Sequence, residues 1–225
     1  TPDLSLAISP DGRQIAYAAQ NLDVPPGPTR NQLYVRSLDN IAVRALPGTE
    51  GAAQPFSSPD GQWVAFFGGT DPSARALKKV SLAGGSAVTV LDKINGGQWG
   101  FGVWGDDDMM VFGTPDAGLT RIAADGTSPR KLTTLQAGEG SHFTPELVPG
   151  SRAALFTIGF RALRSPRIEA VMLGTGERRL VVENARNPRY LTSGHLLFQR
   201  DEGNLIAPFD AGRLTLTGPA VPLID

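Results

Sequence analysis

Short runs in which apolar and polar residues alternate follow one another along the whole chain. They recur in similar form in "LAISPDGRQIAYAA", Leu6 to Ala19, and in "PFSSPDGQWVAFFG", Pro55 to Gly68. Weaker copies follow in "VWGDDDMMVF", "LVPGSRAALF" and "LTSGHLLF", at a spacing of about 45 residues. Alternation with a period of two, ended by turn residues, is typical of half-buried β-strands. Each copy therefore predicts one strand, a turn and a second strand of a repeated unit.

Two further alternating stretches complete each unit. The third strand reads "NQLYVRSLD" in the first unit and "RIEAVMLGTG" in the fourth, and the fourth strand reads "AVRALPG" and "RRLVVEN". Four strands in chain order form an antiparallel meander, which is the blade of a β-propeller. We expect an all-β fold, a single β-propeller domain whose five visible blades cover approximately residues 1–48, 49–94, 95–138, 139–184 and 185–225. The pattern is compatible with a five-bladed propeller and with part of a propeller of six or more blades.

The repeated Ser-Pro-Asp-Gly segment has the residues of a tight turn. Proline sets φ at the first corner, the aspartate side chain accepts a hydrogen bond from a backbone N–H two residues on, and glycine takes a positive φ. We interpret the following residues as structural turns: Pro10, Asp11 and Gly12, and Pro59, Asp60 and Gly61. In the third unit we align Asp106 with the motif aspartate and Asp107 with the glycine. The fourth unit keeps only the proline, as Pro149, so the carboxylate is dispensable for the turn.

Composition limits the classes of function. Charged residues make up 19% of the 225 residues and the net charge is -1, so the phosphate backbone of a nucleic acid is not an expected partner. The chain has no cysteine, which excludes disulfides and thiolate metal sites. No apolar run approaches the roughly 18 residues that span a bilayer, so we expect no membrane insertion by this segment. Because the chain starts at Thr1 rather than at Met, we expect a piece of a longer polypeptide.

The segments "SPDGRQIAY" and "SPDGQWVAF", joined through "LYVRSLD" and "LPGTEGAAQPFSSPDG", resemble the TolB-like, WD-type propeller repeats of bacteria. The run "LYVRSLDNIAVRALPGTEGAAQPFSSPDGQWVAFF" and the ending "LIAPFDAGRLTLTGPAVPLID" are similar to propeller regions attached to bacterial Ser/Thr kinases and winged-helix regulators. The resemblance implies a periplasmic or otherwise extracytoplasmic sensor or protein-binding module, covalently linked to further domains. The chain itself lacks the kinase motifs.

No linear motif predicts catalysis. The nearest approach to a Gly-x-Ser-x-Gly elbow, "GGSAV" at 84–88, lacks the closing glycine. The two histidines, His142 and His195, lie in different units and form no zinc-binding pair. Three consecutive acids at 106–108 do not have the alternate spacing of a calcium loop. We therefore predict no catalytic residue, no metal site and no cofactor. A propeller lactonase whose metal ligands come from several first strands remains open, because such ligands leave no linear motif.

The variable loops indicate where recognition takes place. They span 20–31, 68–76 and 159–167, and each joins the second and third strands of its unit. They should therefore emerge on the same side as the segments that lead into each first strand. We call this side the loop end of the blades, and the Ser-Pro-Asp-Gly side the turn end. Variation concentrated on one side of a repeat protein marks a binding surface. The candidate binding residues there are Glu50, Gln54, Trp99, His142 and Arg189.

Three functions follow from these observations. The first is a non-catalytic binding or sensor module that recognises a protein or a small molecule within a larger bacterial protein. The second is a propeller hydrolase or lactonase with a metal at the central channel. The third is a scaffold arm of a larger enzyme, which would be inert in isolation. An enzyme should gather three or more carboxylates or histidines within about 2 to 2.6 Å of an ion, whereas a binding module should present Tyr, Trp and Arg on an open surface.

Overall fold

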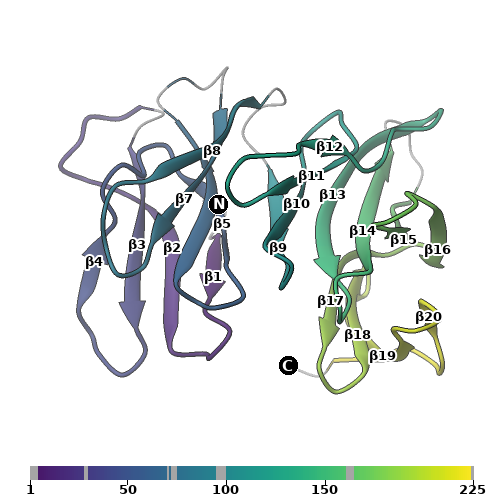
Figure 1. Cartoon of the computed structure of the whole chain (residues 1–225). Helices are drawn as coiled ribbons and strands as arrows, with labels where there is room; N and C mark the ends of the chain where they lie inside the picture. The colour runs from purple at the N-terminus through teal and green to yellow at the C-terminus, as the bar shows by residue number, and fades with distance from the viewer. Residues whose placement is uncertain are drawn as a thin grey trace. The chain divides into compact units, whose positions relative to one another are not determined.

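A computed structural model describes residues 5–27, 30–69, 71, 75–94, 100–160 and 165–223 of the chain (Figure 1). These residues form strands and turns, and none of them belongs to a helix of the length and apolar character that crossing a membrane requires. The chain divides into two compact units. The first consists of residues 1–110 and 122–129, and the second of residues 111–121 and 130–225.

Two complete sheets belong to the first unit. The strands of blade 1 are β1 (Leu6–Ile8), β2 (Gln14–Gln20), β3 (Asn31–Ser37) and β4 (Val43–Ala45). The strands of blade 2 are β5 (Ala53–Ser57), β6 (Trp63–Gly68), β7 (Arg75–Ser81) and β8 (Val88–Ile94). Blade 3 contributes residues to both units, and its strands are β9 (Phe101–Trp104), β10 (Met109–Gly113), β11 (Leu119–Ala123) and β12 (Arg130–Lys131).

The second unit contains blades 4 and 5. The strands of blade 4 are β13 (Glu139–Leu147), β14 (Ala153–Phe160), β15 (Arg167–Met172) and β16 (Arg178–Val182). The strands of blade 5 are β17 (Arg186–Leu191), β18 (His195–Arg200), β19 (Gly203–Asp210), β20 (Thr215–Leu216) and β21 (Val221–Pro222). In blade 5 the place of the fourth strand is shared, because β20 and β21 pair with different parts of β19.

In every sheet the strands lie side by side in chain order, and the pairs with assigned register are antiparallel. Five such four-stranded meanders are the blades of a β-propeller, so the predicted all-β propeller fold with five blades is confirmed. Within each unit the core lies between neighbouring sheets. Blades 1 and 2 bury Leu33, Val64 and Phe66 with no exposed surface, and blades 4 and 5 bury Leu155 and Leu196 in the same way.

The Ser-Pro-Asp-Gly turns join the first and second strands of blades 1 and 2. The hydroxyl of Ser9 donates to Asp11 over 2.5 Å, and the N–H of Arg13 donates to the same carboxylate oxygen over 3.0 Å. These two bonds lower the pKa of Asp11. Gly12 has a φ of 70° and its N–H bonds the Ser9 carbonyl. Ser58, Asp60 and Gly61 repeat this arrangement in blade 2.

The third turn corrects the alignment of Asp106 and Asp107. Asp108 takes the glycine position, with a φ of 57° and an N–H that bonds the Gly105 carbonyl. Asp107 takes the aspartate position, because it accepts the N–H of Met109 over 3.2 Å. Asp106 therefore stands where the other turns have proline. The alignment was one residue out because an aspartate tolerates a positive φ better than most residues other than glycine.

The first strands of blades 2, 4 and 5 share a bulge. Its central residues are Gln54, Thr144 and Asn187, with φ between 47° and 55°, and each precedes a proline. Proline has no N–H to donate and is tolerated in a strand at such irregularities. Hydroxyls of the preceding blade bind two of the bulges: Ser5 accepts the N–H of Gln54 over 3.1 Å, and Thr157 accepts that of Asn187 over 2.9 Å.

Candidate functional site

A buried ionic cluster in blade 4 contains His142 and Glu139. Both side chains lie on β13, and Glu139 is 2% exposed while His142 has no exposed surface. The carboxylate of Glu139 accepts bonds from Arg178 at 2.6 Å, from Arg167 at 3.0 Å and from the N–H of Gln136 at 2.7 Å. It also bonds the Nε2 of His142 over 3.0 Å. Two arginines, a histidine and a backbone amide therefore surround a single carboxylate.

The neighbours of His142 fix its tautomer. Nε2 faces the ionised carboxylate of Glu139 and must carry the proton. Nδ1 lies 2.7 Å from the hydroxyl of Thr133, which already accepts the N–H of Leu119 over 2.8 Å. The Thr133 hydroxyl therefore donates to Nδ1. Burial lowers the pKa of His142, outweighing the hydrogen bond from Glu139 that raises it, so the ring is neutral at pH 7.

A second carboxylate closes the cluster. Glu169 on β15 accepts the Nε of Arg167 at 2.6 Å and the Nε of Arg178 at 2.8 Å. Burial on its own would raise the pKa of Glu139, but the bonds from Arg178, from the Gln136 N–H and from His142 hold it at about 2. Burial disfavours the charge on Arg178, yet the two glutamates raise its pKa overall. At neutral pH the cluster therefore pairs the ionised Glu139 and Arg178 with a neutral His142.

The polar side-chain atoms of Glu139 and His142 are bonded within the described residues. General base catalysis needs a nitrogen or oxygen that a substrate proton can reach, and both nitrogens of His142 are occupied and buried. Arg178 borders a pocket of about 420 Å³ beside Lys131, but its Nη atoms bond Glu139 and the carbonyl of Thr134. The geometry therefore favours a structural role, joining blade 4 to the segment that precedes it.

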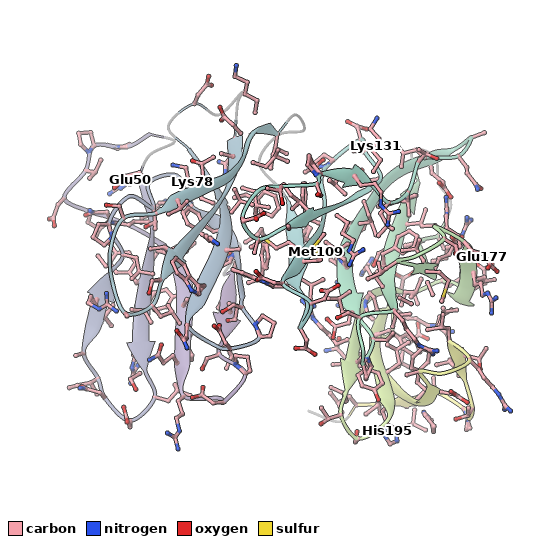
Figure 2. All side chains as sticks on the ribbon, viewed as in Figure 1. Glu50, Lys78, Met109, Lys131, Glu177 and His195 are labelled. Atoms are coloured by element: carbon pink, nitrogen blue, oxygen red, sulfur yellow. The ribbon has the colours of Figure 1, made fainter. Side chains whose placement is uncertain are left out.

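A different pocket opens at the loop end of blade 2. It has a volume of about 430 Å³ and its charged lining residues are Glu50, Asp71, Lys78 and Asp92. Figure 2 shows Glu50 and Lys78 near the same end of the first unit. The carbonyl of Glu50 accepts the N–H of Gly69, which brings the segment before β5 against the loop after β6. Among the described residues, the side chains of Glu50 and Lys78 have no hydrogen-bond or ion-pair partner, so both are available to a ligand.

The structure places the predicted binding residues in different surroundings. Glu50 lines the pocket just described, whereas Gln54 forms the bulge of β5 in the same unit. His142 belongs to the buried cluster of the second unit. Arg189, also in the second unit, donates to Glu146 over 2.9 Å across neighbouring first strands. Trp99 lies outside the described residues.

Sequence reasoning missed the partners of His142. Glu139 stands three residues before it in "GEGSH", a segment expected to lead into a first strand, and the register shift between Glu139 and Ser141 brings the two side chains together. Arg178 is 36 residues further along the chain and leaves no linear signal. No group of three His, Asp or Glu side chains that could hold a metal ion occurs in the described part of the chain.

No protein-family model and no curated protein matches this sequence. Solved structures match over nearly its whole length. TolB from Acinetobacter baumannii is 15% identical with a TM-score of 0.71, over 94% of this chain and 52% of that one. A TolB-like protein from Agrobacterium tumefaciens is 15% identical with a TM-score of 0.72, over 93% of this chain and 78% of that one. A prolyl endopeptidase is 13% identical with a TM-score of 0.65, over 97% of this chain and 34% of that one.

The chain thus spans about half the length of the first of these proteins, and a smaller share of the endopeptidase. At these identities the likeness shows the fold, which is a TolB-like β-propeller. The matched proteins include both TolB and a prolyl endopeptidase, so proteins of different function share this fold.

Proposed function

We propose that this chain is a non-catalytic binding module, which recognises a protein or a small-molecule ligand at the loop end of blade 2. The observation that carries the proposal is the pocket in which the side chains of Glu50 and Lys78 have no hydrogen-bond or ion-pair partner among the residues that the structure describes. Glu139, His142 and Arg178, in contrast, have shifted pKa values and are bonded within one cluster of blade 4. Charged groups free at a concave surface serve recognition, and groups that saturate one another serve stability.

The chemistry of the pocket defines the ligand it suits. Glu50 offers an acceptor and Lys78 a donor, while Thr89, paired with Lys78 across β7 and β8, adds a hydroxyl. A ligand with both donors and acceptors, such as a peptide segment, matches this lining better than an apolar molecule. In this proposal the module acts outside the cytoplasm and is joined to further domains, in line with its resemblance to propeller regions of bacterial signalling proteins. The TolB-like fold supports this assignment.

Site-specific photocrosslinking tests the proposal. A photoreactive amino acid is placed at Thr89, in the pocket, and at Val43, which is 49% exposed on β4 of blade 1. We expect discrete crosslinked adducts when the photoreactive amino acid is at position 89, and none when it is at position 43. The adducts should disappear when Glu50→Gln or Lys78→Met is added. Equal adducts from both positions would contradict the proposal. The purified chain is also assayed for metal content and for hydrolysis of lactones, esters and peptides, and turnover with a stoichiometric metal would replace the proposal with the lactonase hypothesis.

A further inference from the structure

A second pocket lies at the turn end of blades 2 and 3, entirely within the first unit. Its volume is about 390 Å³, and the lining residues that matter are Trp63, Lys79, Trp104, Asp60, Asp106 and Asp108. This volume lies in the range of about 300 to 1,000 Å³ in which proteins bind small ligands or side chains. The pocket is distinct from the one at the loop end and is independent of the function proposed above.

Strand register and one glycine bring the two indole rings together. Trp63 on β6 pairs with Ser81, and Lys79 pairs with Ala65, so Trp63 and Lys79 are diagonal neighbours on one face of blade 2. Trp104 ends β9, which approaches blade 2 closely because residue 102 is glycine. A Cβ at Gly102 would lie 2.5 Å from the ring of Phe56, a distance that no side chain tolerates.

The pocket already holds a cation between its aromatic walls. The ammonium of Lys79 lies 5.2 Å from the ring centroid of Trp63 and 5.8 Å from that of Trp104. Both distances are within the range of cation–π attraction. Lys79 forms no ion pair with any residue in the described ranges, so the indole rings are its immediate partners.

The rim of the pocket is acidic. Asp60, Asp106 and Asp108 line the pocket together with Lys79. A fourth carboxylate, Asp125, lies close enough to Lys79 for the ammonium to contribute, after the hydrogen bonds from Thr127, to the lowering of its pKa. The hydroxyl of Ser58 and the N–H of Gln62 lower the pKa of Asp60, which is therefore ionised. Asp108 accepts the indole N–H of Trp104 over 2.9 Å, which fixes the ring. Asp106 has no hydrogen-bond or ion-pair partner among the described residues, and its carboxylate is exposed.

The geometry points to a binding site for a basic side chain, an arginine of a protein partner, between Trp63 and the carboxylates of Asp60 and Asp106. An arginine fits because its planar guanidinium stacks on an indole face and bonds a carboxylate with two parallel N–H groups. The excess of negative charge favours a cation over an anion. Tryptophan and arginine are also the residues that most often dominate the binding energy of protein interfaces.

The ammonium of Lys79 occupies the position on the indole rings that the guanidinium of a bound arginine would take. The flexible lysine side chain is an internal cation, which an incoming guanidinium displaces from the indole faces toward solvent. Loss of the ammonium should therefore strengthen the binding of a basic peptide, because it removes both a competitor and a repelling charge. A site for an anionic ligand would show the opposite response, since Lys79 would then be the attracting group.

Calorimetric titration of the whole chain with short peptides tests the inference. The probe is acetyl-Gly-Arg-Gly-Arg-Gly-amide, with glutamine and glutamate versions of the same peptide and maltohexaose as comparisons. We expect the arginine peptide to bind at least fivefold more tightly than the glutamine peptide. Trp63→Leu should weaken its binding at least fivefold, Asp106→Asn two- to fivefold, and Lys79→Met should tighten it at least twofold.

Matched variants in the second unit separate a local effect from net charge. Glu177→Gln repeats the charge change of Asp106→Asn, and Lys131→Met repeats that of Lys79→Met, on residues that Figure 2 shows in blades 3 and 4. Both should leave the affinity unchanged within a factor of 1.5. The inference is overturned if the glutamine peptide binds as tightly as the arginine peptide, if Lys79→Met weakens binding, or if maltohexaose binds and the arginine peptide does not. The surface variant Asp106→Asn keeps the test decisive if Trp63→Leu does not fold.

Discussion

His142 and Glu139 are three residues apart on one β-strand, yet their side chains meet on the same face over 3.0 Å. In a regular strand, residues i and i+3 point to opposite faces. The pairing of β13 with β14 shifts between Glu139 and Ser141, and this irregularity turns Glu139 to the side of His142. A local break in the ladder therefore builds the buried cluster.

Removal of the imidazole should destabilise the chain without affecting ligand recognition. We expect His142→Leu to lower the free energy of unfolding by about 2 to 4 kcal/mol, because Glu139 and Thr133 lose a partner while buried. The side chain of His195 is partly exposed and, among the described residues, bonds Ser193 alone, so His195→Gln should change stability by less than about 0.5 kcal/mol. Urea unfolding compares the two variants, and a loss below 1 kcal/mol for His142→Leu would contradict the structural role.

The same pair predicts an acid-sensitive stability. The pKa of Glu139 falls from its ordinary 4.5 to about 2 on folding, so its contribution of about 3 kcal/mol is present above pH 4.5 and is lost as the pH falls toward 2. The pKa of His142 is also lowered on folding, so its contribution begins to decline below its ordinary value of 6.5. We expect the stability contributed by this pair to fall from pH 6.5 downward, most steeply between 4.5 and 2. Glu139→Gln should flatten the lower part of the curve and His142→Gln the upper part.

The third residue after the first turn residue has a positive φ in these turns, so glycine should be favoured there. Removing glycine from one turn and introducing it into another should therefore change stability in opposite directions. Gly12 has a φ of 70° and open space around its Cα, so Gly12→Ala should cost about 1 kcal/mol through backbone strain alone. Ser151 has a φ of 47° at the same place in the blade 4 turn, and Ser151→Gly should gain about 0.5 kcal/mol. Thermal unfolding checks both variants. If both substitutions changed the stability in the same direction, the two turns would not be equivalent.

The hydroxyl of Thr157 should contribute more to the stability of the fold than its methyl group. It accepts the N–H of the Asn187 bulge and bonds the hydroxyl of Thr144 over 2.7 Å, and all of Thr157 is buried. Thr157→Val keeps the volume and removes both bonds, so we expect a loss of about 1 to 3 kcal/mol. Thr215→Val, on the exposed edge strand β20, is the control and should be neutral. Hydrogen exchange of the backbone N–H of Asn187 should accelerate in Thr157→Val and not in Thr215→Val.

Arg189 should act on the ionisation of Glu146. Burial raises the pKa of Glu146, and the charge and hydrogen bond of Arg189 lower it in part. Arg189→Gln should therefore raise this pKa further. A folded-state pKa above the ordinary 4.5 gives stability at low pH that is lost as the pH rises through the folded value. The variant should lose more stability at pH 8 than at pH 5, and carboxyl carbon NMR should report the titration directly.

The sequence predicts the fold well because the blade is encoded locally. The turns, strands and alternation patterns of one blade lie within about 45 residues, and the same pattern recurs in several copies along the chain. The bulges also have a local signal that the sequence interpretation missed. Pro55 and Pro145 each stand four residues before a turn proline, Pro59 and Pro149, where an unbroken strand would exclude them.

The sites are harder to predict because they depend on contacts between residues that are distant in the sequence, either within one blade or between two blades. Nothing near His142 in the sequence indicates Arg178, and nothing near Trp63 indicates Trp104. Asp60 and Asp106 show a further difficulty: the turn motif explains their presence, so a second role at the surface leaves no additional trace in the sequence. Only the packing of β9 against blade 2 places their carboxylates around one pocket.

The turn at the end of the first strand forms from Ser-Pro-Asp-Gly in blade 2 and from Gly-Asp-Asp-Asp in blade 3 with the same N–H to carbonyl closure. Backbone geometry and surface chemistry are thus separable at this point of the repeat. For protein engineering, the side chain at the second position of this turn, the partly exposed Pro59 in blade 2 and the exposed Asp106 in blade 3, is the one to vary, because Ser58 and Asp108 bond the strands beside them.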